Sequence, residues 1–115
     1  MTPSAIDHAT FDELRETVGG EFANELADTF LADAPTMLAA LRKAFEARDA
    51  ETFRRTAHSL KSNGATFGAR TLAAMAKALE QGGMAPVEAA AGAPLADLDA
   101  EYARVAAELE ALKRA

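Results

Sequence analysis

The sequence contains no cysteine. This absence excludes a disulfide framework and any metal site built from thiolates. No stretch approaches the roughly 20 consecutive apolar residues that a membrane-spanning helix requires, so we expect no association with a membrane. The first residues also lack the apolar run of a signal peptide, and the cytoplasm is therefore the expected location.

Basic residues are fewer than acidic residues in this sequence. The chain carries 12 Lys and Arg residues against 18 Asp and Glu residues, which gives a formal net charge of −6 and an isoelectric point near 4.8. Nucleic acids and anionic membranes both require a basic face on the protein that binds them. The composition therefore argues against nucleic acid and membrane as partners and favours another protein or a small molecule.

Strand-forming residues are scarce as well, whereas Ala, Leu, Glu, Lys and Arg dominate the sequence. These residues favour helix. With 115 residues, of which 50% are hydrophobic, the chain can bury one compact core and has no room for a second domain beside it. The prediction is a single all-α domain that spans residues 1–115.

Apolar residues recur at helical spacing in five segments. A capping-box pattern, Thr10 to Glu13, opens the first segment. Pro35 predicts a kink or a short break in the second. Residues 82–94 are rich in Gly, Ala and Pro and are predicted to form a connecting loop. The predicted helices span residues 10–18, 20–48, 50–67, 69–81 and 95–113.

The third and fifth segments carry the most regular apolar stripes. Their apolar residues alternate three and four positions apart, which is the spacing of a helix face buried in a bundle. Asp49 is placed to cap the third helix. Four long amphipathic helices predict an antiparallel four-helix bundle, with the short first helix capping one end. The stripes are Phe53, Ala57, Leu60, Gly64 and Phe67 in the third segment and Leu95, Leu98, Tyr102, Val105, Leu109 and Leu112 in the fifth.

His58 lies on the face of the third helix that points away from the stripe. Because successive residues are about 100° apart around a helix, His58 lies at about 140° from the centre of the stripe. Arg54 and Lys61 flank it, and Ser62 and Ala65 are small enough for a partner to approach the ring. An incoming phosphoryl group would meet positive charge on this face. The same geometry also fits a solvated helix face that happens to contain a histidine.

The third segment also carries a specific motif. From Ala57 to Ala69 the chain reads Ala-His-Ser-Leu-Lys-Ser-Asn-Gly-Ala-Thr-Phe-Gly-Ala, with an apolar residue two positions after the histidine, a lysine three after it and a glycine ten after it. This pattern resembles the signature of the histidine-containing phosphotransfer (HPt) family, and the resemblance extends from near Ile6 to the last helix. Two positions depart from the family pattern. Ser62 stands where glycine is frequent, and Glu80 corresponds to a frequent glutamine.

The resemblance implies a phosphoryl carrier of two-component phosphorelays. His58 would accept a phosphoryl group from a phospho-aspartate of a receiver domain and pass it to another receiver, and the receiver would bring the metal and most of the catalytic apparatus. The implied partners are receiver domains of response regulators and a hybrid histidine kinase. The carrier itself would use no cofactor and have no ATP-dependent kinase activity. We expect a monomer, because the face that transfers the group must stay open.

Lys61 and Glu80 are the other candidate site residues. One nitrogen of a neutral imidazole attacks phosphorus only if the other holds the proton, so an acceptor for that N–H fixes the tautomer. Glu80, at the edge of the next helix, is placed to be that acceptor, or it is an ordinary solvated residue of the last turn. Lys61 is predicted to neutralise the phosphoryl oxygens, unless it only covers the surface.

The predicted partner-binding surface surrounds His58 and reaches the first helix. Arg54, Lys61 and two further arginines, Arg55 and Arg70, locally reverse the acidity of the chain, which would suit the acidic pocket of a receiver. Ser62 and Ala65 complete this surface. At the capped end of the bundle, Leu14 and Val18 either extend it or belong to the core.

Two other functions fit part of this pattern. The dimerisation domain of an autophosphorylating histidine kinase is also helical with an exposed histidine, but that family follows its histidine with an acidic residue and soon a proline. Ser59 and Leu60 follow here, and the chain has no room for an ATP-binding domain. The remaining alternative is a helical interaction module in which His58 is never modified. His8 is predicted to be a surface residue, and two lone histidines give no reason to expect a metal site.

Overall fold

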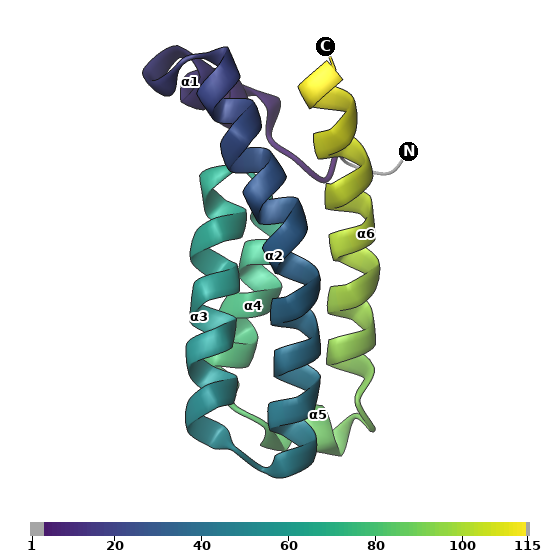
Figure 1. Ribbon diagram of the computed structural model, residues 1–115. Coiled ribbons are helices and arrows are strands. Elements are labelled where there is room, and N and C mark those ends of the chain that lie inside the picture. The colour runs from purple at the N-terminus through teal and green to yellow at the C-terminus, as the bar shows by residue number, and fades with distance from the viewer. Residues whose placement is uncertain (1–3, 115) are drawn as a thin grey trace.

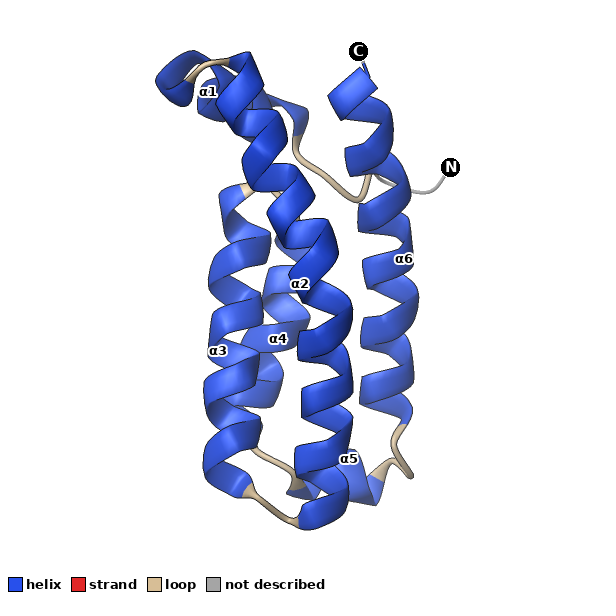
Figure 2. Cartoon of the chain, in the orientation of Figure 1, coloured by secondary structure: helices blue, strands red, loops and turns tan. Residues whose placement is uncertain are grey.

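The computed structural model describes residues 4–114, and all regular structure in that range is helical (Figure 2). The predicted all-α class is confirmed. Residues 1–3 and 115, which the predicted domain includes, lie outside the described residues. The helices are α1 (His8–Val18), α2 (Gly20–Ala47), α3 (Ala50–Thr66), α4 (Arg70–Gly82), α5 (Ala85–Ala89) and α6 (Ala93–Arg114).

Four long helices, α2, α3, α4 and α6, form a bundle (Figure 1). Each packs against two of the others, in the cyclic order α2, α3, α4, α6. Short turns join α2 to α3 and α3 to α4, so these neighbours run antiparallel. The short helix α1 crosses one end of the bundle, and α5 lies at the other. The predicted antiparallel four-helix bundle with a capping N-terminal helix is confirmed.

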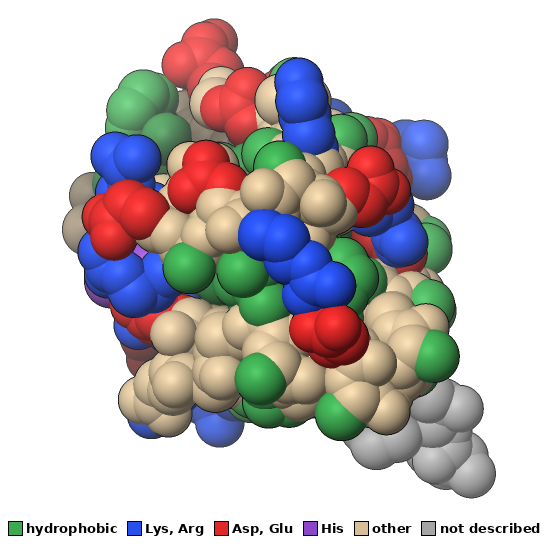
Figure 3. Space-filling view, turned by 90° about the horizontal axis from the view of Figure 1, so that it is seen from below, with side chains coloured by type: hydrophobic (Ala, Val, Ile, Leu, Met, Phe, Trp, Pro, Cys, Tyr) green, Lys and Arg blue, Asp and Glu red, His purple; other side chains and the backbone are tan. Residues whose placement is uncertain are grey.

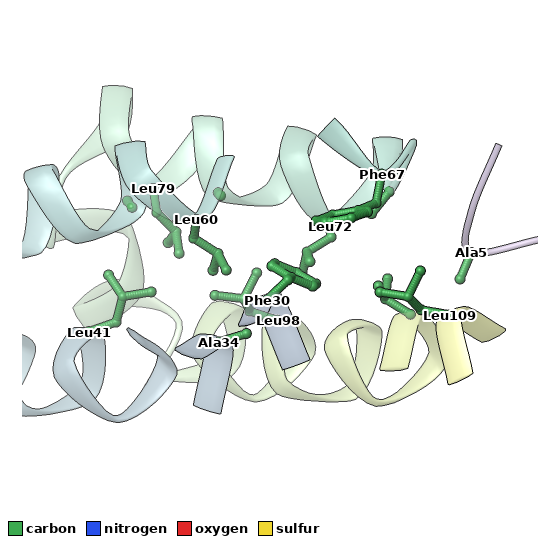
Figure 4. Packing of buried hydrophobic residues seen from close by; sticks show 14 of the residues in the cluster. Ala5, Phe30, Ala34, Leu41, Leu60, Phe67, Leu72, Leu79, Leu98 and Leu109 are labelled. Atoms are coloured by element: carbon green, nitrogen blue, oxygen red, sulfur yellow. The ribbon is translucent and has the colours of Figure 1, made fainter. Parts of the chain in front are cut away.

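The apolar stripes of the helices meet in one core (Figure 4). The predicted stripe of α3 is buried along its whole length, and the stripe of α6 is buried except for Tyr102 and Leu112 at its edge. Phe30 of α2 joins the two stripes, because its ring centroid lies 5.2 Å from that of Phe67 and 6.0 Å from that of Tyr102. Burying a large apolar side chain stabilises the fold by about 1.5–3 kcal/mol, so this packing fixes the rotation of each helix about its axis.

Helix α2 runs unbroken through Pro35, so no break occurs where the sequence predicts a kink or break. A proline inside a helix has no N–H to donate to the carbonyl four residues earlier, which here belongs to Leu31. The hydroxyl of Tyr102 on α6 donates to that carbonyl oxygen at 3.4 Å. A contact from a distant helix thus replaces part of what the proline removes.

The start of α1 and the segment between α4 and α6 also differ from the prediction. Helix α1 begins at His8 rather than at the capping-box pattern, and the hydroxyl of Thr10 donates to the carboxylate of Asp7 at 2.6 Å instead of capping the backbone. The predicted loop 82–94 contains the short helix α5. The Val87 side chain of α5 is buried, and Pro86 lies in the first turn of this helix, where proline is well tolerated.

The segment that precedes α1 is fastened across the bundle. The carboxylate of Glu108 on α6 accepts hydrogen bonds from the backbone N–H groups of Ala5 at 2.8 Å and Ile6 at 3.2 Å. Both side chains are buried. The backbone N–H of Asp7 donates to the carbonyl of Gly68, in the turn between α3 and α4, at 2.8 Å. These contacts tie the N-terminal segment to α6 and to the end of α3.

At the end of the bundle where α5 lies, basic and acidic side chains are interspersed and do not form separate patches of one charge (Figure 3). Arg42 pairs with Asp99 at 2.5 Å, and Arg48 pairs with Glu88 at the same distance. In the part of the chain that the structure describes, no helix is both long and apolar enough to cross a membrane.

Gly68→Ala is expected to destabilise the fold more than Gly92→Ala. Both glycines have a positive φ, 80° and 83°, and a left-handed alanine costs about 1 kcal/mol at either position. At Gly68 an added Cβ would also lie 2.7 Å from the carbonyl oxygen of Asp7, whereas at Gly92 it meets nothing within 4 Å. Overpacking of this kind should add at least about 1 kcal/mol. Urea unfolding measures both losses, and equal losses would show that the N-terminal segment moves aside freely.

Candidate functional site

Helix α3 presents His58 to solvent because its neighbours face the core. Asp49 caps the helix, as predicted, by accepting a hydrogen bond from the backbone N–H of Thr52 at 3.1 Å. Ala57 and Leu60, on either side of His58 in the sequence pattern, are fully buried. The His58 side chain is 55% exposed. The stripe therefore holds the imidazole on the outer face, where a partner can reach it.

The tight turn between α3 and α4 brings the last turn of α4 alongside His58. The two helices share the most extensive contact of any helix pair. Gly64 of α3 faces α4 in this interface: a Cβ added there would lie at ordinary contact distance, 3.6 Å from Leu72 and 3.7 Å from the carbonyl oxygen of Ala69. This antiparallel packing places Glu80 beside His58, although the two residues are 22 positions apart in the chain.

Glu80 contacts both of the other predicted site residues. Its Oε2 lies 2.7 Å from Nδ1 of His58, and its Oε1 accepts a hydrogen bond from Nζ of Lys61 at 2.8 Å. The Glu80 side chain is only 16% exposed and that of Lys61 28%. An ionised carboxylate can only accept hydrogen bonds, so Nδ1 must carry the ring proton. The lone pair of a neutral imidazole then lies on Nε2.

The carboxylate of Glu80 is stabilised in its charged form. The hydrogen bond from Lys61, followed by that from His58, lowers the pKa of Glu80 from its ordinary value of 4.5, against the opposing effect of desolvation. Glu80 is therefore ionised at neutral pH. The sequence indicates a role for Glu80 at His58 and a separate role for Lys61 at the phosphoryl group, but it does not indicate that one carboxylate holds both side chains.

The arginines near the motif are less available than the sequence suggests. Arg54 donates to Glu51 at 3.0 Å, Arg55 lies 3.5 Å from the same carboxylate, and Arg70 pairs with Asp7 at 2.8 Å. The expected local reversal of charge is therefore partly neutralised. Exposed ion pairs are worth at most about 1 kcal/mol, so these arginines can exchange partners at little cost.

The predicted partner-binding residues fall into two groups. Ser62 and Ala65 are exposed on the outer face of α3, within two turns of His58. Leu14 and Val18 lie instead on α1, which crosses the end of the bundle, and both are partly buried. Leu14 packs against the core. These two residues therefore lie on a different helix from His58, Ser62 and Ala65.

Two hollows lie near this region that the sequence does not predict. A groove of about 270 Å³ between α2 and α3 is lined by Leu26, Phe30, Asn63 and Phe67, among others. A second hollow, of about 440 Å³, lies at the α1 end beside the N-terminal segment and includes His8. His8 is exposed, as predicted, and its Nε2 lies 2.9 Å from Glu108. Among residues 4–114 no cluster of three or more His, Asp or Glu side chains is arranged to hold a metal ion.

Two comparisons with known proteins indicate the same family. The model of the Hpt domain family matches residues 25–115 of the chain. Among solved structures, the chain is similar to histidine-containing phosphotransfer protein B (HptB) from Pseudomonas aeruginosa PAO1, with 28% sequence identity and a TM-score of 0.88. The match covers 98% of this chain and 97% of HptB. No curated protein sequence matches this chain.

Lys61→Ala is expected to raise the pKa of Glu80 toward 4.5, because Lys61 is the largest cause of its depression. The ¹³C NMR signal of the Glu80 carboxyl group measures this titration. Since the pKa is lower in the folded chain than in the unfolded chain, the charged pair stabilises the fold above the ordinary carboxyl range. That contribution is lost as the pH falls through the lower, folded value.

Arg48→Ala is the matched control for this titration. Arg48 lowers the pKa of Glu88 in the same way, through an ion pair that includes neither His58 nor Glu80. The control should move the titration of Glu88 and leave that of Glu80 in place. A Glu80 titration that does not change in Lys61→Ala would mean that the hydrogen bond between them is absent in solution.

Proposed function

The chain belongs to the Hpt domain family, whose role is phosphotransfer in two-component phosphorelays, and from that premise we propose that His58 is the residue that carries the phosphoryl group. One observation supports this assignment above the others. The contact between Nδ1 of His58 and the Glu80 carboxylate, at 2.7 Å, places the lone pair of the neutral imidazole on Nε2, and the His58 side chain is exposed. An exposed nitrogen lone pair of this kind is a nucleophile for phosphorus.

The transfer consists of one bond exchange at phosphorus. The Nε2 lone pair of His58 attacks the phosphorus of an aspartyl phosphate on a receiver domain, and the Nε2–P bond forms. The P–O bond to the aspartate breaks, and its electron pair returns to the carboxylate. The same steps in reverse pass the phosphoryl group to the aspartate of another receiver, with His58 as the leaving group.

Lys61 supplies positive charge for this exchange. It lies one turn from His58 on the same helix, and its ammonium group is held 2.8 Å from Glu80 in the unmodified protein. A phosphoryl group on Nε2 carries negative charge on its oxygens, and a positioned cation stabilises that charge in the transition state. Lys61 would therefore divide its hydrogen bonds between Glu80 and the phosphoryl oxygens.

Receiver domains and histidine kinases are the partners with which Hpt domains work. For this chain, the surface around Ser62 and Ala65 fits such a partner, because small side chains let an active-site loop approach the ring. Arg54 supports it from the same helix face. Contact with Leu14 and Val18 would require a partner that also reaches over α1. The protein would act as a monomer in the cytoplasm.

Proteins of this family are phosphoryl carriers rather than kinases. A kinase must hold the phosphates of ATP with a glycine-rich backbone loop or a basic clamp and must coordinate Mg²⁺. The sequence offers no such set. We therefore propose that the chain takes its phosphoryl group only from a receiver and never from ATP.

His58→Gln should abolish labelling and leave the fold intact, because the ring projects from the surface and its loss opens no cavity. Purified protein is incubated with a phosphorylated receiver, and the label is followed by mass spectrometry. His8→Gln is the matched control and should accept label at the normal rate. Retained labelling of His58→Gln would overturn the assignment.

The same experiment with Mg-ATP in place of the receiver tests the carrier role. No label should appear on the wild-type chain. Self-labelling would favour a kinase, and failure of a broad panel of phosphorylated receivers to label the chain would favour the unmodified interaction module.

Lys61→Ala should slow transfer from a phosphorylated receiver by about 10- to 100-fold, which corresponds to losing about 1.4–2.8 kcal/mol of transition-state stabilisation. Its melting temperature should change little, since a partly exposed lysine contributes little to folding. Single-turnover kinetics and a melting curve measure the two effects. An unchanged rate would limit Lys61 to its hydrogen bond with Glu80 and remove it from the transfer step.

A further inference from the structure

Position 80 holds a carboxylate, which can accept hydrogen bonds but cannot donate them. From its contact with Nδ1 we propose that Glu80 keeps the proton on Nδ1 after His58 is phosphorylated on Nε2, so that the phosphoryl group always leaves from a protonated imidazole. This inference rests on the proposed function, in which His58 is the phosphoryl carrier. It concerns the phosphorylated state, whereas the orientation of the ring by Glu80 concerns the free state. Glu80 is then a positioning residue that sets how readily the phosphoryl group leaves.

The contact is built to persist while the ring reacts. The Glu80 side chain is 16% exposed, whereas the ring of His58 is 55% exposed. The carboxylate therefore belongs to the more buried side chain of the pair, and Nε2 lies across the ring from the contact at Nδ1. Lys61 fixes the second carboxylate oxygen at 2.8 Å, so the first is held toward Nδ1.

The number of protons on the ring decides its charge after phosphorylation. In the free state the neutral ring has a proton on Nδ1 and a lone pair on Nε2. When that lone pair forms the bond to phosphorus, the ring becomes a cation if Nδ1 keeps its proton. If the proton is lost to water, the ring is neutral and Nδ1 carries a lone pair.

Glu80 discriminates between these two forms. A lone pair on Nδ1 would face a negatively charged oxygen at 2.7 Å with no hydrogen atom between them. The protonated ring instead forms a charge-assisted hydrogen bond with the carboxylate. Lys61 and His58 are the two charged or titratable groups that act on Glu80, both from α3, and together they lower its pKa. Glu80 is therefore a carboxylate when the ring attacks phosphorus.

An amide at this position would not discriminate in the same way. The side chain of glutamine can turn its NH₂ group toward Nδ1 and donate a hydrogen bond to the lone pair. It therefore accommodates the neutral phosphorylated ring, which a carboxylate disfavours. Glu80→Gln changes this property while keeping the length and shape of the side chain.

The protonation state controls the leaving group in onward transfer. When the Nε2–P bond breaks, its electron pair returns to Nε2. From a protonated ring the product is neutral imidazole, a weak base and a good leaving group. From an unprotonated ring the product would be imidazolate, a much stronger base, unless a proton is first taken from solvent. Glu80 thus lets the carrier receive and release its group without exchanging a proton with water.

The test uses ¹⁵N NMR of the phosphorylated protein at mildly alkaline pH, where phosphohistidine exposed to solvent loses its ring proton. Wild type, Glu80→Gln and the control Glu88→Gln are phosphorylated with phosphoramidate, a small-molecule donor that needs no receiver. Glu88 is an acid on α5 that pairs with Arg48, so the control removes the same charge from a carboxylate that is not bonded to His58. Wild type and control should show the chemical shift of a protonated Nδ1, and Glu80→Gln that of an unprotonated Nδ1. An unprotonated Nδ1 in the wild type would overturn the inference.

A kinetic measurement gives a second readout. Phosphorylated Glu80→Gln should pass its group to a receiver at least about tenfold more slowly than wild type at mildly alkaline pH, and the difference should narrow as the pH falls and solvent protonates the ring. Equal rates at every pH would count against the inference. If Glu80→Gln accepts no label, the Nδ1 signal of the wild type decides alone. Wild type that accepts no label at His58 would instead overturn the proposed function.

Discussion

The antiparallel packing of α3 against α4 is the constraint on which the arrangement at His58 depends. Leu60 and Gly64 of α3 and Leu72 of α4 are buried in the interface and core, and the turn between the helices leaves little freedom for one to slide along the other. A slip of one residue along α4 would rotate its side chains by about 100°. Glu80 would then leave the imidazole. Core packing, rather than any local feature of the surface, therefore sets the distance between Nδ1 and the carboxylate.

One carboxylate serves two neighbours in this arrangement. Lys61 and His58 bind different oxygens of Glu80, so a change at either contact is felt at the other. The Glu80 carboxylate holds the imidazole at Nδ1, while the rest of the His58 side chain stays exposed to a partner. This division suits the phosphoryl-carrier role that we propose for His58, because the ring would have to be reachable by more than one receiver.

Contacts between distant segments keep the rest of the bundle in position. Tyr102 of α6 donates to the carbonyl oxygen that Pro35 leaves without its helical partner, and Glu108 of the same helix binds the segment before α1. Helix α6 therefore does more than complete the four-helix bundle. It compensates for a proline in α2 and fastens the N-terminal segment.

The sequence by itself determines the longer helices, their buried faces and the outward position of His58, because the spacing of apolar residues is a local property that fixes which side of a helix is buried. The motif around His58 also indicates the family. The uninterrupted course of α2, the start of α1 at His8, the helix α5 and the pairing of Arg54 with Glu51 become evident only in the folded chain. The sequence alone leaves two interpretations of Glu80 open: an acceptor for the imidazole N–H, or a solvated residue of the last helical turn. Its contact with both His58 and Lys61 is decided by tertiary structure, because the partner of a carboxylate depends on how two helices are aligned along their axes, and no periodicity within either helix contains that information.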